Sequence, residues 1–151
     1  MGQAAAIVVG VILVVGLVQA AIWVPLGLRW KRRNREFWEG FDADLAASGE
    51  QVARGPEDAI YRGATGTYGS VKGNGRLVLT DRRLVFRKAT GGVVEVPRAR
   101  ITGTHEAKAF LGSRVGGRTH LVITTDDPAE LGFFVDDLDA WASALESARP
   151  A

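Results

Sequence analysis

The side chains that could do chemistry in this chain are few and widely spaced. Its two histidines, His105 and His120, fall on separate predicted strands, and the absence of cysteine excludes a thiolate metal site and a thiol nucleophile. Ser70 and Ser113 lack the sequence context of an activated serine. The acids at 126–127 precede a proline, which is typical of a turn. We therefore predict no metal, no cofactor and no enzymatic activity.

A glycine-rich stretch superficially resembles a phosphate-binding loop. Gly63, Gly66 and Gly69 are evenly spaced and Lys72 follows them. A P-loop requires a glycine, four residues and then Gly-Lys-Ser/Thr at the start of a helix, and no such string is present. Glycines in a strand-rich region more often mark bulges and bends. We expect neither a nucleotide nor a nucleic acid as partner.

Basic residues gather around one predicted hairpin and form a possible anionic-ligand edge. Near an anionic leaflet each such side chain contributes about 1 kcal/mol of attraction. The alternative is a solvated strand edge whose charges prevent aggregation. Both interpretations remain open for Lys72, Arg76, Arg82, Arg83, Arg87 and Lys88.

The elements that must position these residues are mainly strands. Short apolar runs alternate with Gly, Asn and Asp, and tight turns are predicted at Asn74-Gly75, Asp81-Arg82 and Gly91-Gly92. Strands at spacings of about 8 to 12 residues indicate an antiparallel sandwich or barrel. The predicted strands are 60–71, 76–80, 83–88, 93–96, 101–107, 119–125 and 131–135.

A single helix is predicted at the carboxy-terminal end. Asp136 or Asp137 can cap it, and Leu138, Trp141 and Leu145 then repeat at helical spacing. Such a stripe must be buried on the sheet or across the mouth of a barrel. We predict that Trp141 is a core side chain rather than a ligand contact.

The segment 75–86, Gly-Arg-Leu-Val-Leu-Thr-Asp-Arg-Arg-Leu-Val-Phe, followed by Val-Val-Glu-Val-Pro at 93–97 and by Ile101, resembles bacterial pleckstrin-homology-like (PH-like) and GRAM-like domains. The resemblance covers about residues 59–148. It implies an α+β, mainly β fold, in which a bent seven-stranded antiparallel barrel is closed by one carboxy-terminal helix. The phosphoinositide motif of eukaryotic PH domains is incomplete here, since Lys72 and Arg76 match it and Val78 does not.

Residues 4–28 carry no formal charge, and Gln19 is their only strongly polar side chain. A helix of this length reaches roughly 38 Å, enough to cross a hydrocarbon core of about 30 Å. A cleavable signal peptide would need a basic start, which is absent, and the apolar run continues beyond the small-residue site at 18–20. We predict an uncleaved transmembrane helix.

The flanks of this helix predict its orientation. Five basic residues follow it and none precedes it, so the amino terminus is expected outside and the rest of the chain in the cytoplasm. Two tryptophans near the same end suit the headgroup layer. The predicted membrane-interface residues are Trp23, Arg29, Trp30, Lys31, Arg32, Arg33 and Arg35.

Between the membrane and the strands lies an acidic segment. Residues 36–58 carry seven acids against Arg54. Phe37, Phe41 and Leu45 have helical spacing, which predicts a short amphipathic helix over 36–47, lying either on the membrane or on the following domain. A simple juxtamembrane continuation of the span is an equal alternative. Residues 48–58 are predicted to be a linker. The expected organisation is therefore a span at 4–28, a juxtamembrane segment and linker at 29–58, and a PH-like domain at 59–148.

Three functions are compatible with these features. The first is a membrane-anchored, non-catalytic cytoplasmic module for binding or scaffolding. The second is a membrane-surface sensor that contacts anionic lipid headgroups. The third is a small accessory subunit of a membrane complex. The expected partners are the lipid bilayer and either anionic headgroups or a membrane or cytoplasmic protein.

Overall fold

The structure is a computed structural model that describes residues 35–147. These belong to two compact units that divide between Ala43 and Asp44. Residues 35–47 are helical, which confirms the helix predicted from the spacing of its apolar residues. In the first unit Arg35 is exposed and pairs with Glu39 at 3.5 Å. The Trp38 ring there packs edge-on against Phe37 and Phe41, with centroid distances of 4.9 and 6.4 Å.

Within residues 35–147, no helix combines the length and apolar character that crossing a membrane requires. The predicted span at 4–28 lies outside the described residues. The same holds for the predicted interface residues Trp23, Arg29, Trp30, Lys31, Arg32 and Arg33.

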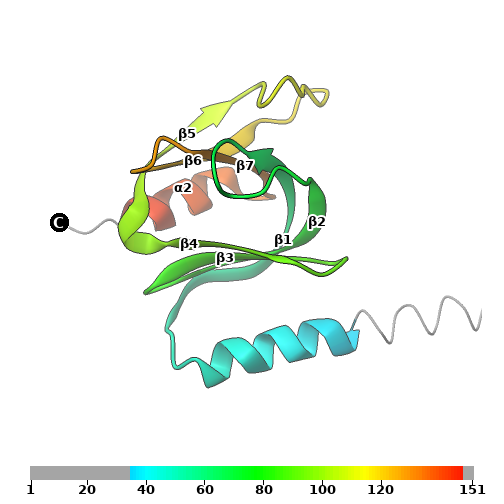
Figure 1. The fold of residues 1–151 in the computed structure, drawn as a ribbon, viewed down its shortest axis with the longest axis vertical. Coiled ribbons are helices and arrows are strands. Elements are labelled where there is room, and N and C mark those ends of the chain that lie inside the picture. Colours follow the sequence, from blue (N-terminus) through cyan, green and yellow to red (C-terminus); the bar gives the residue numbers. More distant parts are fainter. Residues whose placement is uncertain (1–34, 148–151) are drawn as a thin grey trace, which may run out of the picture. The chain divides into compact units, whose positions relative to one another are not determined.

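The second unit contains a seven-stranded antiparallel sheet (Figure 1). Its order is β4-β3-β2-β1-β7-β6-β5. The elements are β1 (Val52–Ala64), β2 (Gly73–Thr80), β3 (Arg83–Lys88), β4 (Val93–Pro97), the 3-10 turn η1 (Arg98–Arg100), β5 (Ile101–Ala107), β6 (His120–Thr125), β7 (Glu130–Phe134) and the helix α2 (Leu138–Ser147).

Strand β1 belongs to both halves of the sheet. It pairs with β2 from Val52 to Tyr61 and with β7 from Ile60 to Ala64, with register shifts along its length. Such shifts bend a strand and increase its twist. Figure 1 shows the result, with β2–β4 on one side of the core and β5–β7 on the other.

Both halves contribute their inward-facing side chains to one core. The alternation of strand residues places Leu77 and Leu79 of β2 and Leu121 and Ile123 of β6 in this cluster, all of them fully buried. The rings of Tyr61, Phe86 and Phe133 meet at its centre, with centroid distances of 5.2 to 5.6 Å.

The mainly β fold with one carboxy-terminal helix is confirmed, but the predicted closure into a barrel is wrong. Strands β4 and β5 stand at the two ends of the strand order and are not paired with each other. They are consecutive in the chain, and Pro97 and η1 form the corner between them. Proline has no N–H to donate to a ladder, and the turn directs β5 onto β6 instead.

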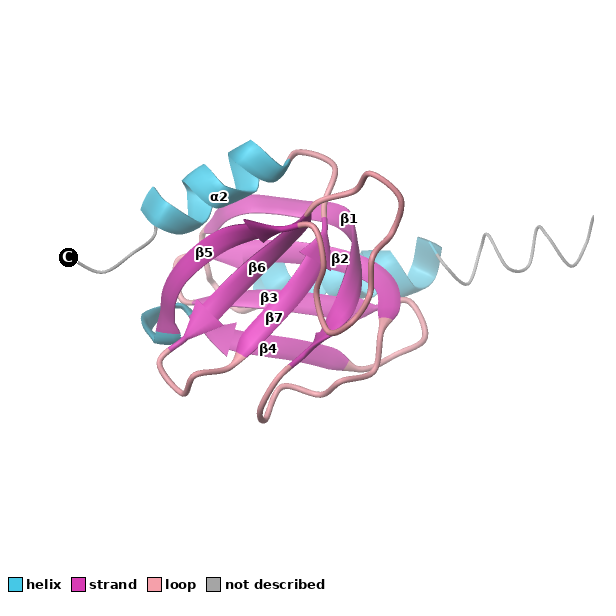
Figure 2. Cartoon of the chain, turned by 90° about the horizontal axis from the view of Figure 1, so that it is seen from above, coloured by secondary structure: helices cyan, strands magenta, loops and turns pink. Residues whose placement is uncertain are grey.

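Figure 2 shows helix α2 from above, beside strands β1 and β5. Its apolar stripe packs on the core. Trp141 is fully buried and Leu145 is 2% exposed, while Leu138 is partly buried against the same cluster. Asp137 accepts a hydrogen bond from the backbone N–H of Ala140 at 3.0 Å, which places it as the amino-terminal cap.

Two sequence-based expectations need correction. Strand β1 begins at Val52, inside the predicted linker, because Gly55 and Pro56 lie at a register shift within the strand. Asn74 and Gly75 form no turn, since both are paired within β2 and the chain reverses over residues 65–72. Glycine is required at 75 because an added Cβ would overlap the carbonyl oxygen of Arg87 on the neighbouring strand.

Candidate functional site

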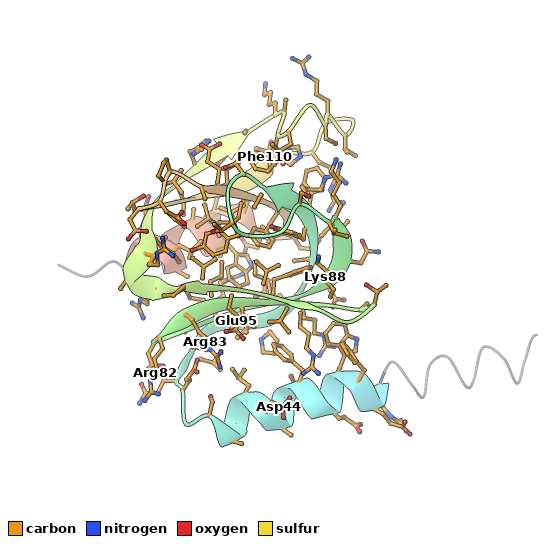
Figure 3. All side chains as sticks on the ribbon, viewed as in Figure 1. Asp44, Arg82, Arg83, Lys88, Glu95 and Phe110 are labelled. Atoms are coloured by element: carbon orange, nitrogen blue, oxygen red, sulfur yellow. The ribbon has the colours of Figure 1, made fainter. Side chains whose placement is uncertain are left out.

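The six basic residues predicted to form one anionic-ligand edge are divided between the two ends of the β2–β3 strand pair. Arg82 and Arg83 lie where β3 begins and Lys88 lies where it ends, as Figure 3 shows. A strand of six residues separates such positions by roughly 17 Å. A single ligand headgroup therefore does not contact all of them.

Arg83 is held by two carboxylates. Its guanidinium contacts Glu50 at 2.8 Å and Glu95 at 3.0 Å, and the Thr80 hydroxyl donates a hydrogen bond to Glu50 at 2.7 Å. The Glu50 side chain is only 7% exposed. The Thr80 hydroxyl first, and then Arg83, hold the pKa of Glu50 below its usual value, while the bond to Glu50 raises the pKa of Arg83. These groups satisfy each other and leave little capacity for a ligand.

Arg76 and Arg87 are direct cross-strand neighbours on β2 and β3. Like charges in this position repel, unless acids offset them. Arg76 pairs with Asp58 at 3.4 Å, and Arg87 pairs with Asp44 at 3.3 Å. Both arginines therefore act within the folded unit.

The remaining three members of the predicted edge differ from one another. The ammonium group of Lys88 lies 5.4 Å from the centroid of the Tyr61 ring. Lys72 and Arg82 are exposed, and neither forms an ion pair with another residue of the described part of the chain. These two belong to different turns, before β2 and before β3.

The two histidines have unrelated environments. His105 is exposed on β5, whereas His120 on β6 is fully buried. The His120 ring stacks on Phe134 at 4.3 Å, and its Nδ1 lies 3.0 Å from the carbonyl oxygen of Ala107. Its Nε2 is buried and has no hydrogen-bond partner among the described residues. His120 is thus part of the packing between β5, β6 and β7.

The serines and acids considered for chemistry are equally separate. Ser113 accepts a hydrogen bond from Arg62, and Ser70 lies in the turn before β2. Arg100 pairs with both acids at 126–127, at 2.8 and 2.9 Å. In residues 35–147 no group of three or more His, Asp or Glu side chains could hold a metal ion.

A hollow that the sequence did not predict lies at the loop between β5 and β6. Its volume is about 510 Å³, and its basic lining comes from Lys108, Arg114 and Arg118, with Gly116 and Gly117 between the arginines. The sequence does contain a signal that could have indicated this basic hollow. Residues 107–125 contain these three cations and no acid, and such an excess of positive charge attracts anions.

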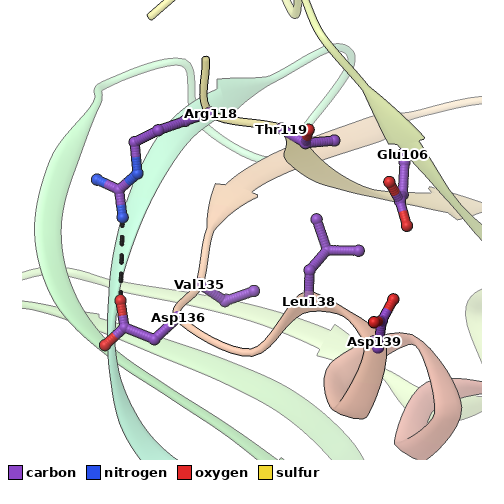
Figure 4. A pocket seen from close by; sticks show the side chains of 7 residues that line it. All are labelled: Glu106, Arg118, Thr119, Val135, Asp136, Leu138 and Asp139. Atoms are coloured by element: carbon purple, nitrogen blue, oxygen red, sulfur yellow. Dashed lines mark ion pairs between the residues drawn. The ribbon is translucent and has the colours of Figure 1, made fainter. Parts of the chain in front are cut away.

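A second, smaller hollow adjoins the start of α2. It has a volume of about 330 Å³ and mixes one cation with three carboxylates (Figure 4). Arg118 lies 3.9 Å from Asp136 across it. The carboxylates outnumber the cation, so this hollow carries a net negative charge and the first hollow is the better candidate for an anion.

The comparisons with known proteins bear on the fold alone. No family model matches this chain, and no curated protein matches it. Among solved structures, the chain is similar to the C-terminal domain of an unknown protein from Leishmania infantum. The TM-score is 0.51 at 17% identity, and the match covers 76% of this chain and 95% of the other.

Proposed function

We propose that this chain is a single-pass membrane protein that carries a PH-like, non-catalytic binding or scaffolding module at the cytoplasmic face. The module comprises residues 52–147, and residues 4–28 hold it at the bilayer. Its task is to recruit or position a ligand or partner at the membrane.

The observation that carries the proposal is the arrangement of the elements. Seven antiparallel strands followed by one helix match the number and order of elements that the PH-like resemblance implies, although the sheet is not closed into a barrel. The register of the resembling hairpin supports it too, since Leu77 pairs with Phe86 and Leu79 with Leu84, and all four face the core. A fold of this kind hosts many functions, so the binding role rests on the charges and on the anchor.

The assignment to a membrane rests on the amino-acid sequence. Residues 4–28 are uncharged, and five basic residues follow directly. An apolar stretch of this length is that of a transmembrane helix, and positive flanks remain on the cytoplasmic side.

The non-catalytic character is supported by the way the reactive groups are used. Glu50 is paired with Arg83 and hydrogen-bonded to Thr80, and His120 is stacked under Phe134. Catalytic groups are expected to converge on a cleft, whereas these stabilise separate parts of the sheet.

The anchor and its orientation can be tested on the full chain in cells. A reporter that works only in the cytoplasm should be active when fused after Ala151, and one that works only outside should be inactive there. The chain should also resist extraction from membranes by alkaline carbonate. Deleting residues 1–34 should release the remainder into the soluble fraction. Reporter activity only outside the cytoplasm, or release of the full chain by carbonate, would overturn the proposal.

The accessory-subunit alternative has a separate test. A stoichiometric partner that co-purifies with the full chain, and still does so after deletion of residues 44–151, would contact the span rather than the sheet unit. That result would replace the binding-module proposal with the subunit interpretation.

A further inference from the structure

The exposed apolar side chains of this chain are unevenly distributed. Five large ones are exposed among the described residues, and three of these lie on two loops: Val71 at 69%, Leu111 at 46% and Val115 at 38%. The other two, Val52 and Val93, lie on strands β1 and β4. Single exposed apolar residues need no explanation, but a group of them on adjoining loops does.

The two loops, residues 65–72 and 108–119, lie side by side. A Cβ added at Gly63 would meet the carbonyl oxygen of Ser70 at 3.1 Å and the Leu111 side chain at 3.2 Å. One residue of β1 is therefore in contact with both loops, and Ser70 directly precedes Val71. We call these two segments the paired loops.

Both loops are held against the sheet by hydrogen bonds and by side-chain packing. The Tyr61 hydroxyl lies 2.6 Å from the carbonyl oxygen of Tyr68 and 2.7 Å from that of Gly69. In the second loop, the Phe110 ring covers Gly132 so closely that a Cβ there would overlap it. Arg62 donates a hydrogen bond to Ser113. These contacts hold the loops in place. Val71, Leu111 and Val115 keep 69%, 46% and 38% of their surface exposed, although the Leu111 side chain also lies over Gly63.

Leu111 is held in a conformation that its side chain disfavours. Its φ is +47°, in the left-handed region that residues other than glycine rarely adopt. Its side chain lies over Gly63 and is still nearly half exposed, so packing accounts for only part of a leucine at this position. Backbone strain of this kind is concentrated at functional sites.

The charges around these tips are positive and have little internal compensation. Lys72, Lys108 and Arg114 are exposed and form no ion pair with any residue of the described part. Arg118 lies 3.9 Å from Asp136, and its guanidinium also lies 5.1 Å from the centroid of the Phe134 ring. The hollow of about 510 Å³ lies between Lys108 and the two arginines and is large enough for a phosphate group.

We infer that the paired loops dock on an anionic phospholipid bilayer. Val71, Leu111 and Val115 enter the boundary between headgroups and acyl chains, and Lys72, Lys108, Arg114 and Arg118 lie over the lipid phosphates. Three small tips give little affinity alone. The inference therefore rests on the proposed function, since an anchored chain presents the loops to the bilayer at high effective concentration.

The chain has no cysteine, so single-cysteine labelling can test this directly. Full-length variants Val71→Cys, Leu111→Cys and Val115→Cys carry an environment-sensitive fluorophore, with Val52→Cys and Val93→Cys as matched exposed controls. Each is reconstituted into vesicles of phosphatidylcholine alone or of an equal mixture with phosphatidylserine. Labels on the paired loops should become shielded from an aqueous quencher in the mixed vesicles, and the control labels should not.

Charge variants define the role of the cations. Removing one cation should lower the ratio of docked to undocked loops about fivefold. The three substitutions Lys72→Gln, Lys108→Gln and Arg114→Gln together should therefore lower this ratio about a hundredfold. Arg82→Gln is the control, because Arg82 is equally exposed but lies at the β2–β3 turn. An effect of Arg82→Gln as large as that of Arg114→Gln would overturn a loop-specific surface.

The outcomes separate this inference from the proposed function. A chain that floats with both kinds of vesicle but shows no shielding at 71, 111 and 115 would retain the anchor and overturn the docking surface. Equal shielding in neutral vesicles would overturn the role of anionic lipid. The same labelled variants can also be measured in native membranes. Shielding that occurs there but in neither kind of vesicle would indicate a protein partner and likewise overturn the inference. Failure to float would overturn the anchor itself.

Discussion

Two charged regions of this molecule look alike in the sequence and differ in the structure. Around β2 and β3, Arg76, Arg83 and Arg87 each lie against one or two carboxylates. In the paired loops, Lys72, Lys108 and Arg114 have no such partner among the described residues. The difference shows that a cluster of cations indicates a binding surface only where the fold leaves the charges uncompensated.

The arginines around β2 and β3 are compensated by acids that lie far away in the sequence. Asp44 and Glu50 precede the sheet, and they contact Arg87 and Arg83 across distances of 43 and 33 residues in sequence. Glu50 is nearly buried, and a buried carboxylate needs a cation and hydrogen bonds to remain charged. Such a network stabilises one arrangement of the sheet, whereas the paired loops remain free to contact something else.

The largest expected effect is in the core that carries both regions. Trp141→Ala should lower the free energy of unfolding by about 3 to 5 kcal/mol, because the indole is fully buried and its removal leaves a cavity. The indole also donates a hydrogen bond to Glu57 at 2.9 Å, which the alanine loses. Chemical denaturation of residues 44–151, the second compact unit, measures the change.

The control for this substitution is Val93→Ala on the exposed edge strand β4. Val93 is 50% exposed, so its truncation should change the free energy of unfolding by less than about 0.5 kcal/mol. A Trp141→Ala effect as small as that of the control would mean that α2 does not pack on the core in solution.

The sequence predicted regular elements well where alternation and turn residues agree. The predicted strands 83–88 and 101–107 coincide with β3 and β5, and the buried face of α2 follows from the spacing of its apolar residues. The start of β1 was missed because Gly55 and Pro56, which usually mark loops, lie at a register shift inside the strand. Asn74-Gly75 was misread for a related reason, since the glycine allows close strand contact rather than a turn.

The candidate site was less predictable. Pairing of Arg83 with Glu50 depends on a contact between segments 33 residues apart, which local patterns do not reveal. The proximity of the paired loops depends on the β1–β7 pairing in the same way. The sequence did contain the acid-free run at 107–125, but its cations are spaced too irregularly to form a motif.

Arg83→Gln and its neighbour Arg82→Gln test the difference between compensated and free charge. Arg83→Gln leaves the nearly buried Glu50 carboxylate without its cation, and should cost about 1 to 3 kcal/mol of unfolding free energy. The lower part of that range is expected because Arg83 is itself 32% exposed. Arg82→Gln should stay within about 0.5 kcal/mol. Denaturation curves of equal midpoint for the two variants would contradict the distinction.

The same network should appear in the pH dependence of stability. The folded pKa of Glu50 is lowered, first by the Thr80 hydroxyl, so its contribution is present above the unfolded value of about 4.3. That contribution is lost as the pH falls through the folded pKa. The stability gap between the wild type and Glu50→Gln should therefore be constant near neutral pH and shrink below about pH 4. A gap that grows on acidification would contradict the assignment.

The smallest expected effect concerns the strained tip of the paired loops. Leu111 has a φ of +47°, which costs a residue with a Cβ about 1 to 2 kcal/mol relative to the right-handed conformation. Glycine avoids this cost but loses more freedom on folding, by about 0.5 to 1 kcal/mol. Leu111→Gly should therefore be more stable than Leu111→Ala by up to about 1.5 kcal/mol.

Position 143 supplies the reversed comparison, because Ser143 is exposed in α2 and helical. There Ser143→Gly should be less stable than Ser143→Ala by about 1 kcal/mol, so the glycine-minus-alanine difference has opposite signs at the two positions. Thermal or chemical denaturation of the four variants measures both differences. If glycine is the less stable residue at 111 as well, the leucine is not strained, and the paired loops lose one of the observations that distinguish them from the compensated region.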